Sequence, residues 1–299
     1  MKPIYYIVIA FTLITLLPLS SYAEGDYLGE KECYACHRNI KKLYLQDIHG
    51  RIFTENPRNE AEARSCEACH GPGALHKDAA DKADMGEKVP LGVKFPFKKG
   101  KENSIDNNGK CLSCHEKGNH SNWQGSIHDM AGLSCIDCHT IHSKDKIDGI
   151  LTCTGCHLQK RAQVQRSSHI SIMDRSVKCT SCHNPHGSAG SKLLEFGSIN
   201  ETCYSCHAEK RGPLLWEHAP VREDCSLCHD SHGSNNPALL KMRTSYLCQS
   251  CHSAIIHPGD LYDGSDMSAK SNMLLGKGCL NCHSMIHGSN HPSGSAFTR

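Results

Sequence analysis

Apolar residues are concentrated in one run near the start of the chain. Residues 4–19 are almost wholly apolar, follow the cationic Lys2 and precede the small-residue sequence at 21–23. A positive region, an apolar region and a small-residue region in this order are typical of a secretory signal peptide. We therefore expect residues 1–23 to be a signal peptide and the mature protein to begin at Glu24. An uncleaved anchor helix is the alternative.

Beyond this run, large apolar side chains are sparse and Gly, Ser, Asn and Pro are frequent. Aromatic residues make up 6% of the chain, and the 38% hydrophobic figure includes twenty cysteines. A polypeptide this poor in large apolar side chains cannot build an ordinary hydrophobic core. The sequence predicts short α-helices joined by long loops, with little or no β-sheet. No later stretch is apolar enough to be expected to span a bilayer.

All twenty cysteines lie in ten copies of Cys-x-x-Cys-His. This motif is the attachment signal of c-type haem, in which both thiols bond to one haem and the histidine ligates its iron. Disulfides do not explain the histidine after every pair, and structural zinc has no need of a fixed Cys-His junction. We expect ten covalently bound haem c groups, which would form the core around which the chain is wrapped. The expected attachment sites are Cys33, Cys36, Cys66, Cys69, Cys111, Cys114, Cys135, Cys138, Cys153, Cys156, Cys179, Cys182, Cys203, Cys206, Cys225, Cys228, Cys248, Cys251, Cys279 and Cys282.

Each motif histidine is the expected iron ligand on one face of its haem. Such a histidine is present in all ten motifs, so no motif has a substituted ligand. The motif ligands are His37, His70, His115, His139, His157, His183, His207, His229, His252 and His283.

The motifs come in pairs, and the other histidines follow the same period. We call each pair with its two extra histidines a repeat: first motif, mid-repeat histidine, second motif, and a histidine soon after it. Five repeats thus supply ten extra histidines, which predicts two histidine ligands for every iron; methionine, the rival ligand, shows no such period. A histidine three residues after a motif is too close to cross its own haem, so it is expected to serve a neighbouring haem, and the other pairings stay open. The distal candidates are His49 and His76, His128 and His142, His169 and His186, His218 and His232, and His257 and His287, whereas His120 and His291 are surplus.

Residues 77–110 form the longest stretch without a motif and are rich in lysine and acidic residues, which predicts a solvated linker. We therefore expect a signal peptide at 1–23, a first two-haem repeat plus linker at 24–110, and four further two-haem repeats at 111–299. The polypeptide has a net charge of +2 without a basic stripe, so nucleic-acid binding has no support.

Two segments carry a family resemblance, SCHAEKRGPLLWEHAPV at 205–221 and CLNCHSMIHGSNHPSG at 279–294. Together with the ten-motif layout and the His-Gly dipeptides after several motifs, they resemble the periplasmic decahaem cytochromes of the MtrA/DmsE type over residues 28–299. The resemblance implies an elongated haem wire in the periplasm, largely inserted in an outer-membrane porin-like β-barrel. It also implies an inner-membrane or periplasmic cytochrome as donor, and an outer-surface multihaem cytochrome or terminal reductase as partner.

An electron-transfer protein without substrate chemistry is the favoured function. A multihaem reductase needs an open iron position, whereas this chain has enough histidines to fill every site. A free periplasmic electron shuttle or store would need no barrel. The direction of electron flow and the terminal donor or acceptor, whether metal, dimethyl sulfoxide or another compound, do not follow from the sequence.

Overall fold

The computed structural model describes residues 25–84, 86–90, 92–143, 149–168, 176–252 and 278–299. The chain packs into two compact regions, an N-terminal region of residues 1–97 with 141–144 and a C-terminal region of residues 98–140 with 145–299. The expected signal peptide lies outside the described residues. The predicted boundary at residue 110 separates the first two motifs from the other eight. It does not describe how the chain packs, and it stays a prediction.

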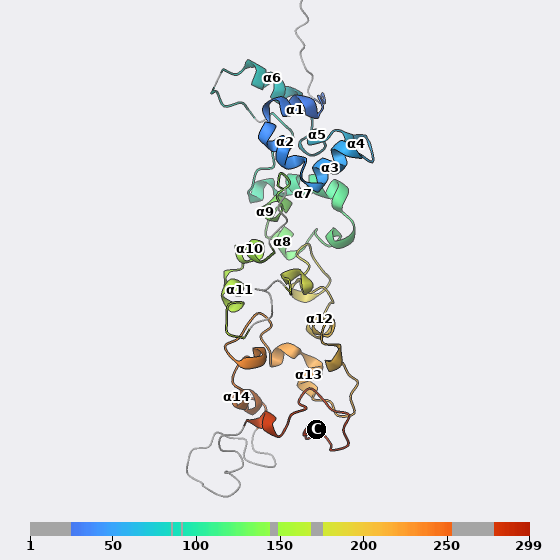
Figure 1. The fold of residues 1–299 in the computed structure, drawn as a ribbon, viewed down its shortest axis with the longest axis vertical. Coiled ribbons are helices and arrows are strands. Elements are labelled where there is room, and N and C mark those ends of the chain that lie inside the picture. The colour runs from blue at the N-terminus through green and yellow to red at the C-terminus, as the bar shows by residue number, and fades with distance from the viewer. Residues whose placement is uncertain (1–24, 85, 91, 144–148, 169–175, 253–277) are drawn as a thin grey trace, which may run out of the picture. The chain divides into compact units, whose positions relative to one another are not determined.

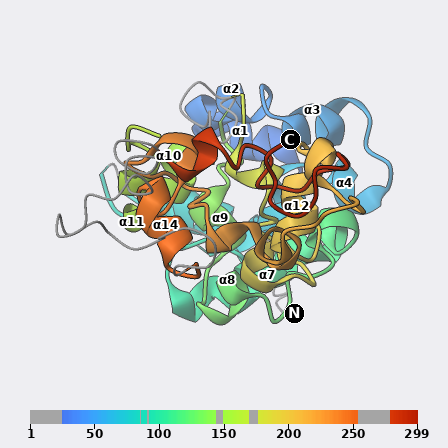
Figure 2. The same ribbon diagram turned by 90° about the horizontal axis from the view of Figure 1, so that it is seen from below.

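Short helices joined by loops make up the described part of the chain, as Figures 1 and 2 show from two directions. The longest helix has 12 residues, and isolated bridges are the only β-type pairing among the described residues. The expected fold class, mostly short α-helices and loops with little or no β-sheet, is therefore confirmed. No helix in the described ranges is both long and apolar enough to cross a membrane.

The N-terminal region contains α1 (Glu30–Cys36), α2 (Arg38–Tyr44), α3 (Ile48–Glu55), α4 (Glu60–Ala63), α5 (Cys66–His70) and α6 (Ala74–Lys82). The α-helices of the C-terminal region are α7 (Ser104–His115), α8 (Ile127–Met130), α9 (Cys135–Cys138), α10 (Gly149–Thr154), α11 (Leu158–Gln163), α12 (Ile199–Tyr204), α13 (Ala219–Glu223) and α14 (Thr244–Gln249). Its 3-10 helices are η1 (Lys101–Asn103), η2 (Gly118–His120), η3 (Cys179–Ser181), η4 (Ser191–Leu193), η5 (Ala208–Lys210), η6 (Cys225–Leu227), η7 (Pro237–Leu239) and η9 (Cys279–Asn281).

One packing arrangement recurs in all five repeats. The helix that carries the first motif packs against the helical turn that begins at the second motif of the same repeat. The packed pairs are α1 with α5, α7 with α9, α10 with η3, α12 with η6, and α14 with η9. The period seen in the sequence is thus also a period of the fold.

The polypeptide does not form a core of its own. Among the described residues, the buried hydrophobic side chains are only Tyr44, Ala74, Trp123, Val164 and Leu194. Large apolar side chains are instead exposed, with relative exposures of 83% for Ile105, 74% for Met130 and 68% for Leu151. Burial of one such side chain would stabilise the protein by about 1.5–3 kcal/mol. A prosthetic group that covers these exposed side chains would therefore stabilise the fold.

Polar side chains fix the backbone where apolar packing is sparse. Asp47, Asn59, Ser126 and Ser198 each accept a hydrogen bond from a backbone N–H in the first turn of α3, α4, α8 and α12, which stabilises helices as short as four residues. The buried Glu67 carboxylate accepts from the N–H groups of Leu28, Gly29 and Gly73 at 2.8–3.1 Å. It thereby ties the segment before α1 to the second motif.

Candidate haem sites

The Cys-x-x-Cys-His motif folds as one helical turn. The backbone N–H of its histidine donates to the carbonyl of its first cysteine, as in His183 to Cys179 at 3.0 Å and His252 to Cys248 at 2.9 Å. Positions i, i+3 and i+4 of a helical turn lie on one face. The two thiols and the imidazole of a motif therefore share a face, as a haem that is attached twice and ligated once requires.

Backbone carbonyls orient the second-motif imidazoles. The Nδ1 atoms of His70, His183, His229 and His283 donate to the carbonyls of Phe95, Lys192, Ala238 and Ala296, respectively, at 2.6–2.9 Å. A histidine that binds a metal through one ring nitrogen usually donates the other to such an acceptor. These hydrogen bonds fix the tautomer in which Nε2 carries no proton and can ligate a metal.

Two distal candidates are held in the same way. The Nδ1 of His76 donates to the Pro90 carbonyl at 3.0 Å, and that of His128 to the Pro185 carbonyl at 2.8 Å. Their Nε2 atoms are therefore also left free for a ligand bond.

The acceptor carbonyls of Lys192 and Ala238 belong to two copies of one strained turn. Lys192 and Leu193, like Ala238 and Leu239, have φ between 54° and 60°, a left-handed conformation that costs about 1–2 kcal/mol for a non-glycine residue. Bridges between His183 and Leu194 and between His229 and Leu240 hold the two turns against their motifs. Both turns contain a Leu-Leu dipeptide, Leu193-Leu194 and Leu239-Leu240, and the sequence alone did not predict them.

Seven motif imidazoles lie opposite a second histidine, with ring centroids 5.9–6.2 Å apart. An imidazole nitrogen binds a metal at about 2 Å, and its ring centre lies roughly 1 Å further back, so one metal ion between two imidazoles requires roughly 6 Å. The rings are inclined by 11–30° in six pairs and by 58° in the seventh. The spacing fits haem iron in each pair. The pairs are His37 with His76, His70 with His142, His139 with His186, His157 with His128, His183 with His232, His229 with His287, and His252 with His218.

Six of the seven pairs follow a rule along the chain, and the exception is His37 with His76, which belong to the same repeat. The histidine that follows a second motif lies opposite the second-motif histidine of the preceding repeat, as in His186 opposite His139 and His232 opposite His183. A mid-repeat histidine lies opposite the first-motif histidine of the next repeat, as in His218 opposite His252. The arrangement agrees with the expectation that a histidine so close to its own motif serves a neighbouring haem.

The cysteines of successive motifs also lie side by side. In each repeat the first cysteines of the two motifs are hydrogen-bonded to one another: Cys33 with Cys66, Cys111 with Cys135, Cys153 with Cys179, Cys203 with Cys225, and Cys248 with Cys279. The hydrogen bond to Cys153 lowers the pKa of Cys179 to about 6. All twenty thiols are free of disulfides. The predicted haem attachment points of the two motifs in each repeat are therefore adjacent.

Comparison with known proteins identifies the family. The model of the doubled CXXCH motif matches residues 173–212 and 218–257. The multihaem cytochrome MtrA of Shewanella baltica is 40% identical over 291 residues, which are 93% of this chain and 84% of that protein. The chain belongs to the MtrA-like multihaem c-type cytochromes. The polyhaem cytochrome OmcB of Geobacter sulfurreducens is 26% identical over 204 residues, which are 57% of this chain and 27% of OmcB.

As an MtrA-like cytochrome, the protein binds haem c and transfers electrons, and it is not an enzyme. Burial suits its histidines to this role, because a metal binds the neutral imidazole. Burial, followed by the neighbouring His120, lowers the pKa of His186 to about 4. Burial is also the main cause of the lowered pKa values of His70, His142, His218, His232 and His287.

The remaining predicted ligands of this MtrA-like cytochrome are less completely placed. The Nδ1 of His49 lies 3.0 Å from the Asp47 carboxylate, while His169 and His257 lie outside the described residues. Their role, like the distal partners of His115, His207 and His283, stays a prediction.

The two surplus histidines differ in their surroundings. The His120 ring lies 5.7 Å from His115 and 4.3 Å from His186, and the second distance is too short for a metal between the rings. The Nδ1 of His291 accepts a hydrogen bond from the N–H of Ser293 at 3.2 Å.

Three His-Gly turns join consecutive repeats of the MtrA-like chain. They comprise residues 186–188, 232–234 and 287–289, and each packs against the segment before the mid-repeat histidine of the preceding repeat. A Cβ on Gly187 or Gly233 would lie 2.0 Å from the carbonyl oxygen of Asn122 or Gln163, respectively, and one on Gly288 would lie 2.4 Å from the Leu214 side chain. At Gly187 and Gly233 the opposing atom is backbone, so only glycine permits this approach, whereas at Gly288 it is the end of a flexible side chain that can move aside.

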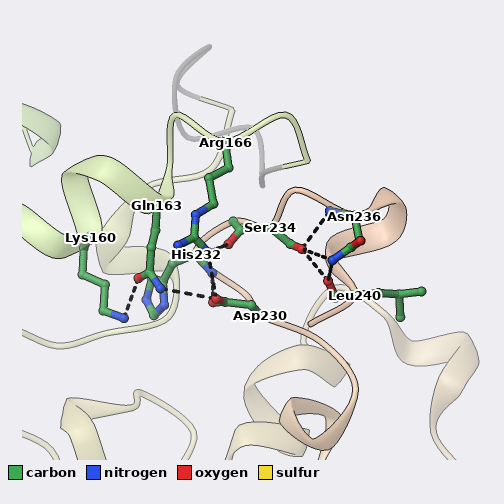
Figure 3. Close-up of polar contacts among 9 residues, drawn as sticks. Lys160, Gln163, Arg166, Asp230, His232, Ser234, Asn236 and Leu240 are labelled. Carbon is green, nitrogen blue, oxygen red and sulfur yellow. Dashed lines mark hydrogen bonds and ion pairs between the residues drawn. The ribbon is translucent and has the colours of Figure 1, made fainter. Parts of the chain in front are cut away.

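Figure 3 shows the second His-Gly turn and its polar contacts. The Asp230 carboxylate accepts from Gln163 at 3.3 Å and lies 3.7 Å from the Arg166 guanidinium, which also donates to the Gly233 carbonyl at 3.1 Å. Ser168 and Ser234 exchange two backbone hydrogen bonds of 2.9 and 2.7 Å. These contacts fix the backbone on either side of His232.

Proposed function

We propose that this cytochrome binds ten haem c groups, each ligated by two histidines, and conducts electrons along them. Its donor is an inner-membrane or periplasmic cytochrome, and its acceptor is an outer-surface multihaem cytochrome or terminal reductase. The observation that carries the proposal is the set of seven opposed imidazole pairs with the spacing of a shared iron.

The chain would both attach each haem and ligate its iron. Bound haem iron exchanges single electrons between its ferrous and ferric forms. The two thiols of a motif would fix the position of the group, and two neutral imidazoles would hold its iron. Because no face is left for a substrate, the residues favour electron transfer over reductase chemistry.

The pairing rule extends the ligand assignment. The mid-repeat histidines His128 and His218 lie opposite the first-motif histidines of the following repeats. Because His169 holds the same mid-repeat position in the third repeat, we expect it to ligate the iron of the motif that ends at His207. Replacement of His169 should then convert that single haem to the high-spin form, whereas an unchanged low-spin count would exclude the assignment.

Adjacent attachment points support conduction along the chain. First cysteines meet within each repeat, and second cysteines approach between repeats, as for Cys182 and Cys206, where the neighbouring thiolate adds to burial in raising the pKa of Cys182. The same holds for Cys228 with Cys251, and Cys156 raises the pKa of Cys138 after burial and the Asp137 carboxylate. Successive haems attached at these cysteines would be neighbours in chain order, so an electron would need only short transfers.

Insertion in an outer-membrane porin-like β-barrel is the further part of the proposal. It is supported by the expected signal peptide and by the similarity to MtrA over 93% of the chain. A free periplasmic shuttle would carry the same haems without a barrel, and a barrel gene beside this one would favour the conduit.

Proteoliposomes separate the conduit from the shuttle. Vesicles that contain a reduced internal dye would receive the cytochrome and the partner barrel, followed by an external ferric acceptor. Fast dye oxidation should require both proteins. A variant at His291, outside the ligand set, should conduct like the wild type, whereas a variant at His232 should conduct more slowly. Conduction that never depends on a barrel would overturn the conduit.

A further inference from the structure

Two asparagines occupy the same position relative to a motif in different repeats. Asn108 and Asn200 each precede the first cysteine of a first motif by three residues, in α7 and α12, respectively. The other three repeats have Glu30, Ile150 and Ser245 at this position. The haem motif itself does not require an amide here.

Both amides reach across to the second motif of their own repeat. The Asn108 side-chain oxygen accepts from the N–H of Cys135 at 2.8 Å, and its nitrogen donates to the Leu133 carbonyl at 2.9 Å. Asn108 is only 4% exposed, so these hydrogen bonds are shielded from competing water.

The contact with the cysteine N–H recurs in the fourth repeat, where the amide nitrogen donates to carbonyls at other positions. The Asn200 side-chain oxygen accepts from the N–H of Cys225 at 2.8 Å. Its nitrogen donates to the carbonyls of Val221 and Arg222 at 3.1 and 2.9 Å. The same 2.8 Å hydrogen bond to the first cysteine of a second motif in two repeats indicates a specific device rather than a chance contact.

Each amide thus holds the backbone at a haem attachment point. Cys135 and Cys225 bear the thiols that are hydrogen-bonded to Cys111 and Cys203, respectively. A hydrogen bond that holds the backbone at Cys135 or Cys225, which we call the clamp, sets the distance between the two thiols. It thereby sets the spacing of the two haems attached there. These hydrogen bonds of the two amides go to backbone groups rather than to an imidazole or a thiol.

We propose that Asn108 and Asn200 are positioning residues that fix the spacing of the two haems within the second and fourth repeats. The inference rests on the proposed haem content, because it concerns how two bound groups are held relative to one another. It adds to the proposed function that these two haem pairs differ from the other three in how they are held. Their spacing depends on one side chain each.

Amide exchange in the wild-type holoprotein gives the first test. The N–H groups of Cys135 and Cys225 should exchange slowly, because Asn oxygens accept from them. Those of Cys179 and Cys279, which have no side-chain acceptor among the described residues, should exchange faster. Equal exchange at the four cysteines would overturn the clamp without any variant.

Asn200→Ala and Asn108→Ala give the second test, with Asn119→Ala as the matched control, because the exposed Asn119 contributes only its carbonyl. Circular dichroism in the Soret band reports the coupling between neighbouring haems. Each of the first two variants should lose part of the coupled signal and keep all haems, and the two losses should add in the double variant. The control should match the wild type.

The outcomes separate this inference from the haem proposal. Unchanged Soret dichroism in Asn200→Ala with full haem content overturns the positioning role and leaves the haem proposal intact. A wild-type protein with fewer than ten haems, measured as pyridine haemochrome, overturns the haem proposal instead. If Asn200→Ala fails to mature, the wild-type exchange comparison decides.

Discussion

Gly233→Ala should displace one axial ligand by a steric effect alone. The added Cβ would lie 2.0 Å from the Gln163 carbonyl oxygen, whereas ordinary contact starts at 3.4 Å, so the two backbones must part by about 1.4 Å. The two backbone hydrogen bonds between Ser168 and Ser234 lie one residue away. His232, directly before the glycine, is opposite His183 at 5.9 Å.

The cost of this substitution has two parts. A non-glycine residue at the φ of 136° adds about 1–3 kcal/mol of strain. Loss of the two backbone hydrogen bonds adds about 1 kcal/mol each. We expect the free energy of unfolding to fall by about 3–5 kcal/mol, and a shift of the order of 1 Å at His232 to open one iron face.

Electron paramagnetic resonance of the oxidised protein and chemical denaturation would measure both effects. Gly233→Ala should show one high-spin haem per chain. The matched control is Gly197→Ala, whose φ of 79° is also positive but which has no atom within 4 Å of its Cβ position. The control should lower the free energy of unfolding through backbone strain but should show no high-spin haem. If the two variants are indistinguishable, close approach at the His-Gly turn does not position the ligand.

Three further predictions concern single side chains. His186→Ala should convert one haem to high spin, whereas His120→Ala should leave every iron low-spin; a high-spin signal in the second variant would instead assign His120 as a ligand. Because burial lowers the pKa of His186 and an iron bond would occupy its proton-accepting nitrogen, the unfolded chain binds a proton below pH 6.5 that the folded chain does not, so the denaturation midpoint should be highest above pH 6.5 and fall as pH decreases; a midpoint that is constant below pH 6.5 would refute the effect. Glu67→Ala leaves three backbone N–H groups without their acceptor, which should cost about 2–4 kcal/mol and speed proteolysis before α1; unchanged proteolysis would contradict the tie.

The features that the sequence predicted correctly are local ones. Attachment needs three residues in one helical turn, so the motif is visible within five consecutive positions. The shortage of apolar side chains likewise predicted short helices and a chain without its own core. Even the neighbour rule for His186 and His232 could be expected, because three residues cannot span a haem.

The features that the sequence did not predict depend on contacts between distant segments. The carbonyls of Lys192 and Ala238 accept from imidazoles nine residues earlier, and every residue type has a carbonyl. Asn200 is informative only once the two motifs of a repeat are known to face each other. The distal partners of the mid-repeat histidines likewise depend on how consecutive repeats pack, which residue spacing alone leaves open.

Near-infrared magnetic circular dichroism of the fully oxidised protein, quantified per polypeptide, tests the central claim most directly. The band of low-spin haem with two histidine ligands is distinct from the bands of His/Met and high-spin haem. The ten motifs and the opposed histidine pairs predict an intensity of ten His/His haems per chain with neither of the other bands. A stoichiometric His/Met or high-spin band, or fewer than ten haems in mature protein, would contradict the account.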